Sequence, residues 1–293
     1  MFDGDDRDAA GAARLAGTSR ELVGNSDASV AARNVQAGLD YYARTFGRDG
    51  IDDAGAGVDV VINDHSTNDA GAEMFQGNGG YYATPTADGG TYEAIRYGGG
   101  NRYQAARGMV DQLPMLNADD LAVHELTHGL IRKETGYLGG HANESGATNE
   151  AIADVMAASA TRDWRIGESM YTPGSAYTAM RDIAHPNDTT VVHGLWTTMD
   201  AVRQRQARGE EAEEHWASGV LSTAAYRVQQ RLGGEAGWSA VERVFYDTID
   251  NGRLGDMSFA AVAGGLRAAA TTLYGTSSVQ YQVLDEELKR GQL

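Results

Sequence analysis

Two histidines with a glutamate beside them are spaced for metal chemistry in this chain of 293 residues. His124 and His128 stand four positions apart, and Glu125 follows the first of them. Residues i and i+4 of an α-helix face the same way, so both imidazoles can reach one ion while the carboxylate lies beside it. This spacing is typical of a zinc site with a carboxylate as general base. The segment therefore predicts one catalytic zinc ion.

A pair of acidic residues downstream supplies the third ligand that such a zinc site still lacks. Catalytic zinc takes three protein ligands and keeps a fourth position open. Glu150 and Asp154 are again four apart on a helical pattern, after a turn and cap expected over residues 143–147. We expect Glu150 to be the third ligand and Asp154 to accept the other ring N–H of a ligand histidine. The chain has no cysteine, which leaves histidine, aspartate and glutamate as candidate ligands.

The elements that must position these residues divide into a strand-rich first part and a helical second part. We expect a helix over residues 31–46, a buried strand over 58–62 and β-hairpins over 77–100. From residue 118 onward the apolar spacing predicts helices over 120–132, 149–161, 219–231, 238–250, 259–274 and 278–289. We therefore expect a mixed α/β lobe over residues 1–134, ending in the histidine helix, and an α-helical lobe over 135–293.

These motifs resemble those of the thermolysin-like neutral metalloproteases. The similarity lies in HELTH at residues 124–128 and NESGATNEAIAD at 143–154, and it extends to residues 41–52, 163–168 and 266–275. The resemblance implies an α+β, two-lobed fold with the zinc site in the cleft between the lobes. It also implies an endopeptidase that cuts internal peptide bonds through a zinc-activated water. A bulky apolar residue after the cut would enter a pocket lined by Leu121, Ile166, Met170 and Met180.

The resemblance implies a histidine that stabilises the negative tetrahedral oxygen together with zinc. Residues 218–226 resemble the family helix that starts just after this histidine, which favours His215 over His193. His193 stays an alternative because Asp188 stands five positions before it. The family carboxylate that orients the histidine falls on Glu210, in an acidic run in which Glu211, Glu213 or Glu214 could serve equally.

Arg181 matches the family arginine that hydrogen-bonds the substrate carbonyl, with a surface ion pair to Asp182 as the alternative. Two departures weaken the match on the substrate side. The family tyrosine before the NESG turn is replaced by His141, so Tyr137 or His141 would donate instead. The family's substrate strand has only residues 68–72 to match it, which predicts an altered peptide-binding edge.

Calcium is the second cofactor that the resemblance implies. Asp120, Asp163 and Glu168 match its carboxylate ligands. Thr161 and Arg165 stand where further acidic ligands would be expected. We therefore expect at most a single calcium ion in place of the family's paired site.

Composition limits the partners. The chain has 24 basic and 41 acidic residues, a net charge of −17 at pH 7, and so would repel nucleic acid. No apolar run approaches the ~18 residues of a membrane span. We expect polypeptide substrates, no membrane partner and a monomer. The first residues lack a signal peptide, so the resemblance predicts a secreted mature form, and a literal reading predicts a cytoplasmic or otherwise delivered protein.

Two alternatives to a general endopeptidase remain open at this point. The altered substrate strand is consistent with a peptidase of narrow specificity, or a toxin-like one. The same changes beside an intact metal motif are consistent with a zinc-retaining binding module with little turnover. Glu125 favours activity, because a zinc scaffold without catalysis needs no base at that position.

Overall fold

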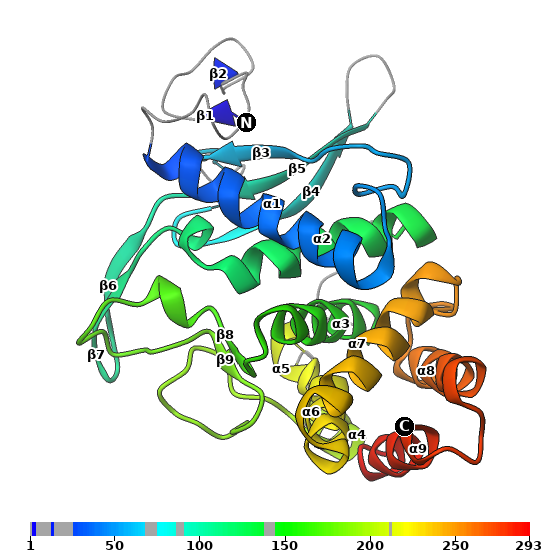
Figure 1. Cartoon of the computed structure of the whole chain (residues 1–293). Helices are drawn as coiled ribbons and strands as arrows, with labels where there is room; N and C mark the ends of the chain where they lie inside the picture. Colours follow the sequence, from blue (N-terminus) through cyan, green and yellow to red (C-terminus); the bar gives the residue numbers. More distant parts are fainter. Residues whose placement is uncertain are drawn as a thin grey trace. The chain divides into compact units, whose positions relative to one another are not determined.

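In a computed structural model, the described residues are 2–3, 13–14, 26–67, 75–85, 91–137, 144–210 and 213–293. The chain divides into two compact units, Met1–Gly129 with Gly167–Ala179, and Leu130–Ile166 with Met180–Leu293. Strands dominate the first unit and helices the second (Figure 1). The lobe boundary expected after residue 134 stays a prediction. Within the described ranges, no helix has the length and apolar character needed to cross a membrane.

The first unit contains a five-stranded sheet. Its strands are β1 (Phe2–Asp3), β2 (Ala13–Arg14), β3 (Asp59–Ile62), β4 (Gly79–Pro85) and β5 (Thr91–Tyr97), in the order β2-β1-β3-β5-β4. β1, β3 and β5 run parallel, whereas β2 and β4 are antiparallel to their neighbours. The β4–β5 pair confirms the hairpin expected over residues 77–100. A separate hairpin of β6 (Asn101–Ala105) and β7 (Gly108–Gln112) follows it.

Helix α2 (Asp119–Thr135), which carries the histidine pair, is packed closely against α1 (Ser26–Phe46) and β4. A Cβ atom on Gly38 of α1 would lie 2.6 Å from Leu126 Cδ1, so a larger residue there would require the Leu126 side chain to move. The Tyr42 hydroxyl lies 2.6 Å from Thr127 Oγ1, which adds a buried hydrogen bond between the two helices. A Cβ atom on Gly129 would lie 2.6 Å from the ring of Tyr81 on β4. These contacts fix α2 from two neighbouring elements.

The second unit is built around α3 (Glu144–Thr161). This helix packs against α5 (Glu214–Ala217), α6 (Gly219–Leu232), α7 (Gly234–Asp250) and α8 (Phe259–Tyr274) (Figure 1). Residues 151–159 of α3 are all buried, as expected for a helix with neighbours all round. The remaining helices are α4 (Met199–Gln206) and α9 (Val279–Arg290), and α9 packs on α6 and α8.

The turn expected over residues 143–147 is wrong for the part that the structure describes, because α3 already begins at Glu144. Tertiary contacts explain the earlier start. The Glu144 carboxylate accepts a hydrogen bond from the Phe259 N–H at 3.1 Å, and the Thr148 hydroxyl donates to the Met257 carbonyl at 2.7 Å. Both contacts reach the segment that starts α8, so they stabilise a first turn that the local sequence alone does not favour.

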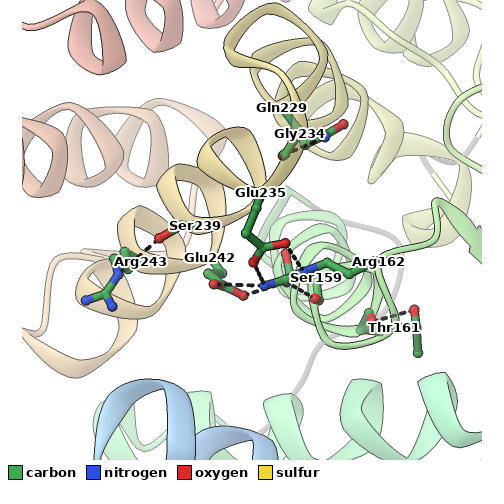
Figure 2. Close-up of polar contacts among 10 residues, drawn as sticks. Ser159, Thr161, Arg162, Gln229, Gly234, Glu235, Ser239, Glu242 and Arg243 are labelled. Carbon is green, nitrogen blue, oxygen red and sulfur yellow. Dashed lines mark hydrogen bonds and ion pairs between the residues drawn. The ribbon is translucent and has the colours of Figure 1, made fainter.

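The other end of α3 is fixed by an ion-pair cluster (Figure 2). Arg162, the residue after the helix, adopts a left-handed conformation with φ of 61°. Its guanidinium pairs with Glu235 at 2.5 Å and with Glu242 at 2.8 Å, both on α7. It also lies over the Trp238 ring, 5.6 Å from the centroid. Because Glu242 is buried, loss of Arg162 would leave a buried carboxylate without this positive charge, which is costly.

Neighbouring glycines on α8 provide a test of the helix packing. A Cβ atom on Gly265 would overlap the carbonyl oxygen of Arg253, whereas one on Gly264 would meet no atom within 4 Å. We predict that Gly265→Ala lowers the free energy of unfolding by about 1–3 kcal/mol, because the backbone around it must move.

The matched control, Gly264→Ala, should leave stability unchanged or raise it by up to about 1 kcal/mol, since alanine favours a helix interior. Urea unfolding of both variants measures the difference. Equal stabilities would refute the close packing of α8 on the residues after α7.

Candidate metal centre

The side chains of His124 and His128 on α2 bring their Nε2 atoms close together. Their Nε2 atoms lie 3.0 Å apart, with ring centroids 4.6 Å apart and ring planes at 90°. Two nitrogens bound to the same tetrahedral zinc, at about 2.0–2.1 Å each, lie about 3.3 Å from one another. The observed spacing of the His124 and His128 nitrogens therefore fits a shared ion after a small adjustment.

Glu150 completes the group. His124, His128 and Glu150 each offer one ligand atom, and these atoms all lie within 4.8 Å of one another. Two imidazole nitrogens and a carboxylate oxygen are a donor set that suits zinc with an open fourth position. These three side chains form a potential metal site. In the ranges that the structure describes, no second group of three such ligands is brought together.

Glu125 is buried beside the histidines on α2. Its Oε2 atom has no hydrogen-bond partner among the described residues. A buried carboxylate without partners is costly for a fold to hold, so such a group points to a functional reason for its presence. The fully buried Tyr97 on β5 responds to the same surroundings: burial, Glu125 and Asp120 raise the pKa of its hydroxyl.

Around Glu150, the second unit supplies a buried arginine. The short antiparallel pair of β8 (Arg165–Ile166) and β9 (Arg181–Asp182) holds Arg181 in place. Its Nη2 atom lies 2.6 Å from Asp154 Oδ1 and 3.9 Å from Glu150 Oε2. Burial opposes its charge, yet the carboxylates of Asp154 and Glu150 outweigh that and raise the pKa of Arg181.

Arg181 is therefore not part of a surface pair with Asp182, which was the alternative interpretation. The side chain is only 1% exposed. Two of its buried nitrogens, Nε and Nη1, have no hydrogen-bond partner in the described part of the chain. Those N–H groups therefore keep unused hydrogen-bonding capacity. A hydrogen bond from a ligand histidine to Asp154 stays a prediction.

His215 lies on α5, with its two ring nitrogens toward different carboxylates. Nε2 is 3.6 Å from Glu150 Oε2, and Nδ1 is 2.5 Å from Glu213 Oε1. Burial lowers its basicity, but Glu150 and Glu213 more than compensate and raise the pKa of His215. Glu210, the first choice for the orienting carboxylate, instead pairs with Arg205 and Arg208. Among the described members of the acidic run, Glu213 bonds His215, and Glu211 lies outside the described residues.

The other predicted site residues lie as follows. The Tyr137 hydroxyl donates to Ser145 Oγ at 2.9 Å, so it is bonded to the start of α3. His141 and the candidate substrate strand at residues 68–72 lie outside the described residues. Leu121, Ile166 and Met170 are fully buried, and Met180 is partly buried.

Of the predicted calcium ligands, Asp120 is buried and bound by backbone. Its oxygens accept N–H bonds from Leu121 at 2.8 Å and from Gly167 at 2.6 Å. Burial raises the pKa of Asp120 to about 7, with a smaller contribution from Glu168, even though both N–H bonds act to lower it. Asp163 accepts an N–H bond from Arg165 at 3.0 Å. Calcium binding stays a prediction.

Two ring side chains lie beside His215: His193, which the sequence offers only as its alternative, and Trp216, for which the sequence gives no signal. The His193 ring stacks on His215, with centroids 5.0 Å apart and planes at 20°. The Trp216 indole N–H donates to His193 Nδ1 at 3.2 Å. His193 and His215, which are alternatives on the sequence alone, therefore lie together in the structure.

Family models match most of the chain. The one described as "Thermolysin metallopeptidase, catalytic domain" matches residues 16–132, and "Thermolysin metallopeptidase, alpha-helical domain" matches residues 140–290. Neutral protease B of Bacillus subtilis (strain 168) is 30% identical over 90% of this chain and 45% of its own length. Thermolysin of Bacillus sp. (strain EA1) is 26% identical over 94% of this chain and 47% of its own length. The chain thus spans about half the length of these relatives.

A solved structure shows the same fold. The precursor of protealysin, a metalloproteinase from Serratia proteamaculans, aligns with a TM-score of 0.71 at 19% identity, over 99% of this chain and 85% of that chain. The expected fold, with strands in the first part and helices in the second, is confirmed.

The buried pair of Arg181 and Asp154 gives a stability prediction. Arg181→Leu removes the ion-pair partner at 2.6 Å from a fully buried carboxylate, so we expect the free energy of unfolding to fall by about 3–5 kcal/mol. The control is Arg203→Leu, which breaks an exposed pair with Asp200 and should cost about 0–1 kcal/mol. Denaturant unfolding at neutral pH measures both. Similar losses in the two variants would contradict the buried pairing.

Proposed function

Because the chain belongs to the thermolysin metallopeptidase family, we propose that it is a zinc-dependent endopeptidase that hydrolyses internal peptide bonds. The observation that carries this proposal is the group of His124, His128 and Glu150, with the buried Glu125 next to it on α2. A zinc ion held by these three side chains would polarise the scissile carbonyl and activate water as the nucleophile.

Glu125 is the proposed general base. Its buried Oε2 has no partner in the described part of the chain, so it is free to take a proton from the attacking water. The same carboxyl group then passes that proton to the nitrogen of the leaving amine. Both steps need a carboxylate held beside the reacting carbonyl, and the rigid packing of α2 supports that placement.

His215 and Arg181 are the proposed donors to substrate oxygens. The carboxylates around His215 raise its pKa and favour the imidazolium, which can donate from Nε2 to a developing negative oxygen. Arg181 would use its unpartnered Nε and Nη1 to bind a substrate carbonyl. Tyr137 and His141 stay candidate donors on the substrate side.

The finer specificity is also a proposal. A preference for a bulky apolar residue after the cut follows from the family resemblance, with Leu121, Ile166, Met170 and Met180 as the candidate lining. Secretion of the protein and a calcium ion at Asp120, Asp163 and Glu168 follow from the same resemblance.

Substitution of the proposed base tests the mechanism. Glu125→Gln keeps the shape of the side chain but cannot accept the proton, so we expect kcat on a blocked internal peptide to fall by about 10²–10⁴-fold. Bound zinc should stay near one per chain, because Glu125 is not a proposed ligand.

The control for that substitution is Glu134→Gln, an exposed position on the same helix, which should keep wild-type activity. Full activity of Glu125→Gln would exclude Glu125 as the base. A wild type that binds zinc but cuts neither the peptide nor a denatured protein would favour a zinc-retaining binding module.

Removal of the metal is a separate test. A chelator should abolish peptide hydrolysis and lower Tm, because an ion bound only to the folded chain stabilises it. Added zinc should restore both. Glu150→Gln should weaken zinc binding while leaving the apo protein folded, as measured by metal content and circular dichroism. Undiminished hydrolysis by the metal-free protein would refute the proposal.

A further inference from the structure

A second histidine lies against His215 in the same unit. His193 belongs to the segment between β9 and α4, whereas His215 lies on α5. Their rings are almost parallel, at 20° and 5.0 Å between centroids. The backbone holds the two segments together: the His193 N–H donates to the Met180 carbonyl at 2.9 Å, and the Trp196 N–H donates to the Trp216 carbonyl at 2.8 Å. The stacking is therefore anchored on both sides.

Trp216 connects the two rings through hydrogen bonds. Its indole Nε1–H donates to His193 Nδ1 at 3.2 Å. An indole N–H can only donate, so His193 Nδ1 is the acceptor and the proton of the neutral ring is on Nε2. The Trp216 backbone N–H donates to Glu213 Oε2 at 3.1 Å, and the other oxygen of Glu213 bonds His215 Nδ1. One residue thus orients both the stacked ring and the carboxylate that hold His215.

Burial, Arg181 and His215 lower the pKa of His193 to about 4, so this ring is neutral near pH 7. A neutral His193 adds no second positive charge beside Arg181.

We propose that His193 is a positioning residue for His215, which it holds by stacking while Trp216 holds His193. In this arrangement Glu213 fixes the Nδ1 end of the His215 ring, and His193 fixes the plane of the ring. The direction of the Nε2–H bond is then set before substrate binds. This inference rests on the proposed function, in which His215 donates to the substrate oxygen.

The test compares His193→Leu in the wild-type and His215→Ala backgrounds, with the zinc-loaded chain of residues 1–293 and a blocked peptide. In the wild-type background we expect kcat to fall about tenfold, with KM and bound zinc unchanged, because misplacement of a catalytic group slows the chemical step. In the His215→Ala background the same substitution should cause no further loss, since His193 acts only through His215.

Three further variants complete the design. His193→Asn keeps an acceptor for the indole and should recover part of the lost kcat. Trp216→Phe removes the donor without changing His193, should lower kcat in the same way, and decides the question if His193→Leu does not fold. His185→Leu, an exposed histidine of the same segment, should leave kcat unchanged. Nitrogen-15 NMR of labelled histidine should find His193 unprotonated at Nδ1, and this signal should change in Trp216→Phe.

The outcomes separate this inference from the proposed function. An active wild type whose kcat is unaffected by His193→Leu would overturn the positioning role alone. So would an equal loss of kcat in both backgrounds, which would indicate general damage to the fold. An inactive, zinc-loaded wild type would overturn the proposed function, and the positioning role with it.

Discussion

Two imidazoles one helical turn apart can share an ion only if the helix that carries them stays wound. Close packing supports helix α2, because a Cβ atom on Gly38 of α1 would lie 2.6 Å from Leu126 of α2, and one on Gly129 of α2 would lie 2.6 Å from Tyr81 of β4. The hydrogen bond between Tyr42 and Thr127 fixes the same helix against sliding along α1. Such packing also holds Glu125 in a buried place that a carboxylate would otherwise leave for water. The chemistry proposed for this chain therefore depends on two glycines that do no chemistry.

The second unit holds several charged side chains at buried or half-buried positions, where each charge needs an opposite charge nearby. Arg181 lies between the carboxylates of Asp154 and Glu150, and His215 lies between those of Glu150 and Glu213. Positive and negative groups thus alternate, and each buried charge has an opposite charge near it. The pKa values of Arg181 and His215 are raised because the carboxylates outweigh burial in both cases. His193, which faces Arg181 and His215 with less compensation, has a lowered pKa instead.

Local signals explain which elements the sequence predicts well. The helix expected over residues 259–274 has those bounds, because Ser258 caps its start and Gly275 follows its end. The histidine pair on α2 is equally local, since helical geometry alone places both rings on one face.

The start of α3 was missed because its first turn depends on contacts with Met257 and Phe259, more than 100 positions away. The contact between His193 and His215 was also missed. His193 lies in a loop before α4 and His215 lies on α5 after it, and no sequence periodicity relates the two positions. Glu210 was preferred to Glu213 because spacing in an irregular segment does not determine which carboxylate turns inward.

Helix α3 is supported at both of its ends by residues that lie far from Glu150 in the sequence. Glu144 bonds the start of α8, and Arg162 is paired with Glu235 and Glu242 of α7. Because contacts at both ends fix the position of α3, loss of either set of contacts would shift the helix and the side chains along it. Glu150 is one of those side chains. If Glu150 binds zinc as proposed, substitutions in α7 or α8 would alter zinc affinity without touching the proposed ligands, and zinc affinity would then report on packing across the helical unit.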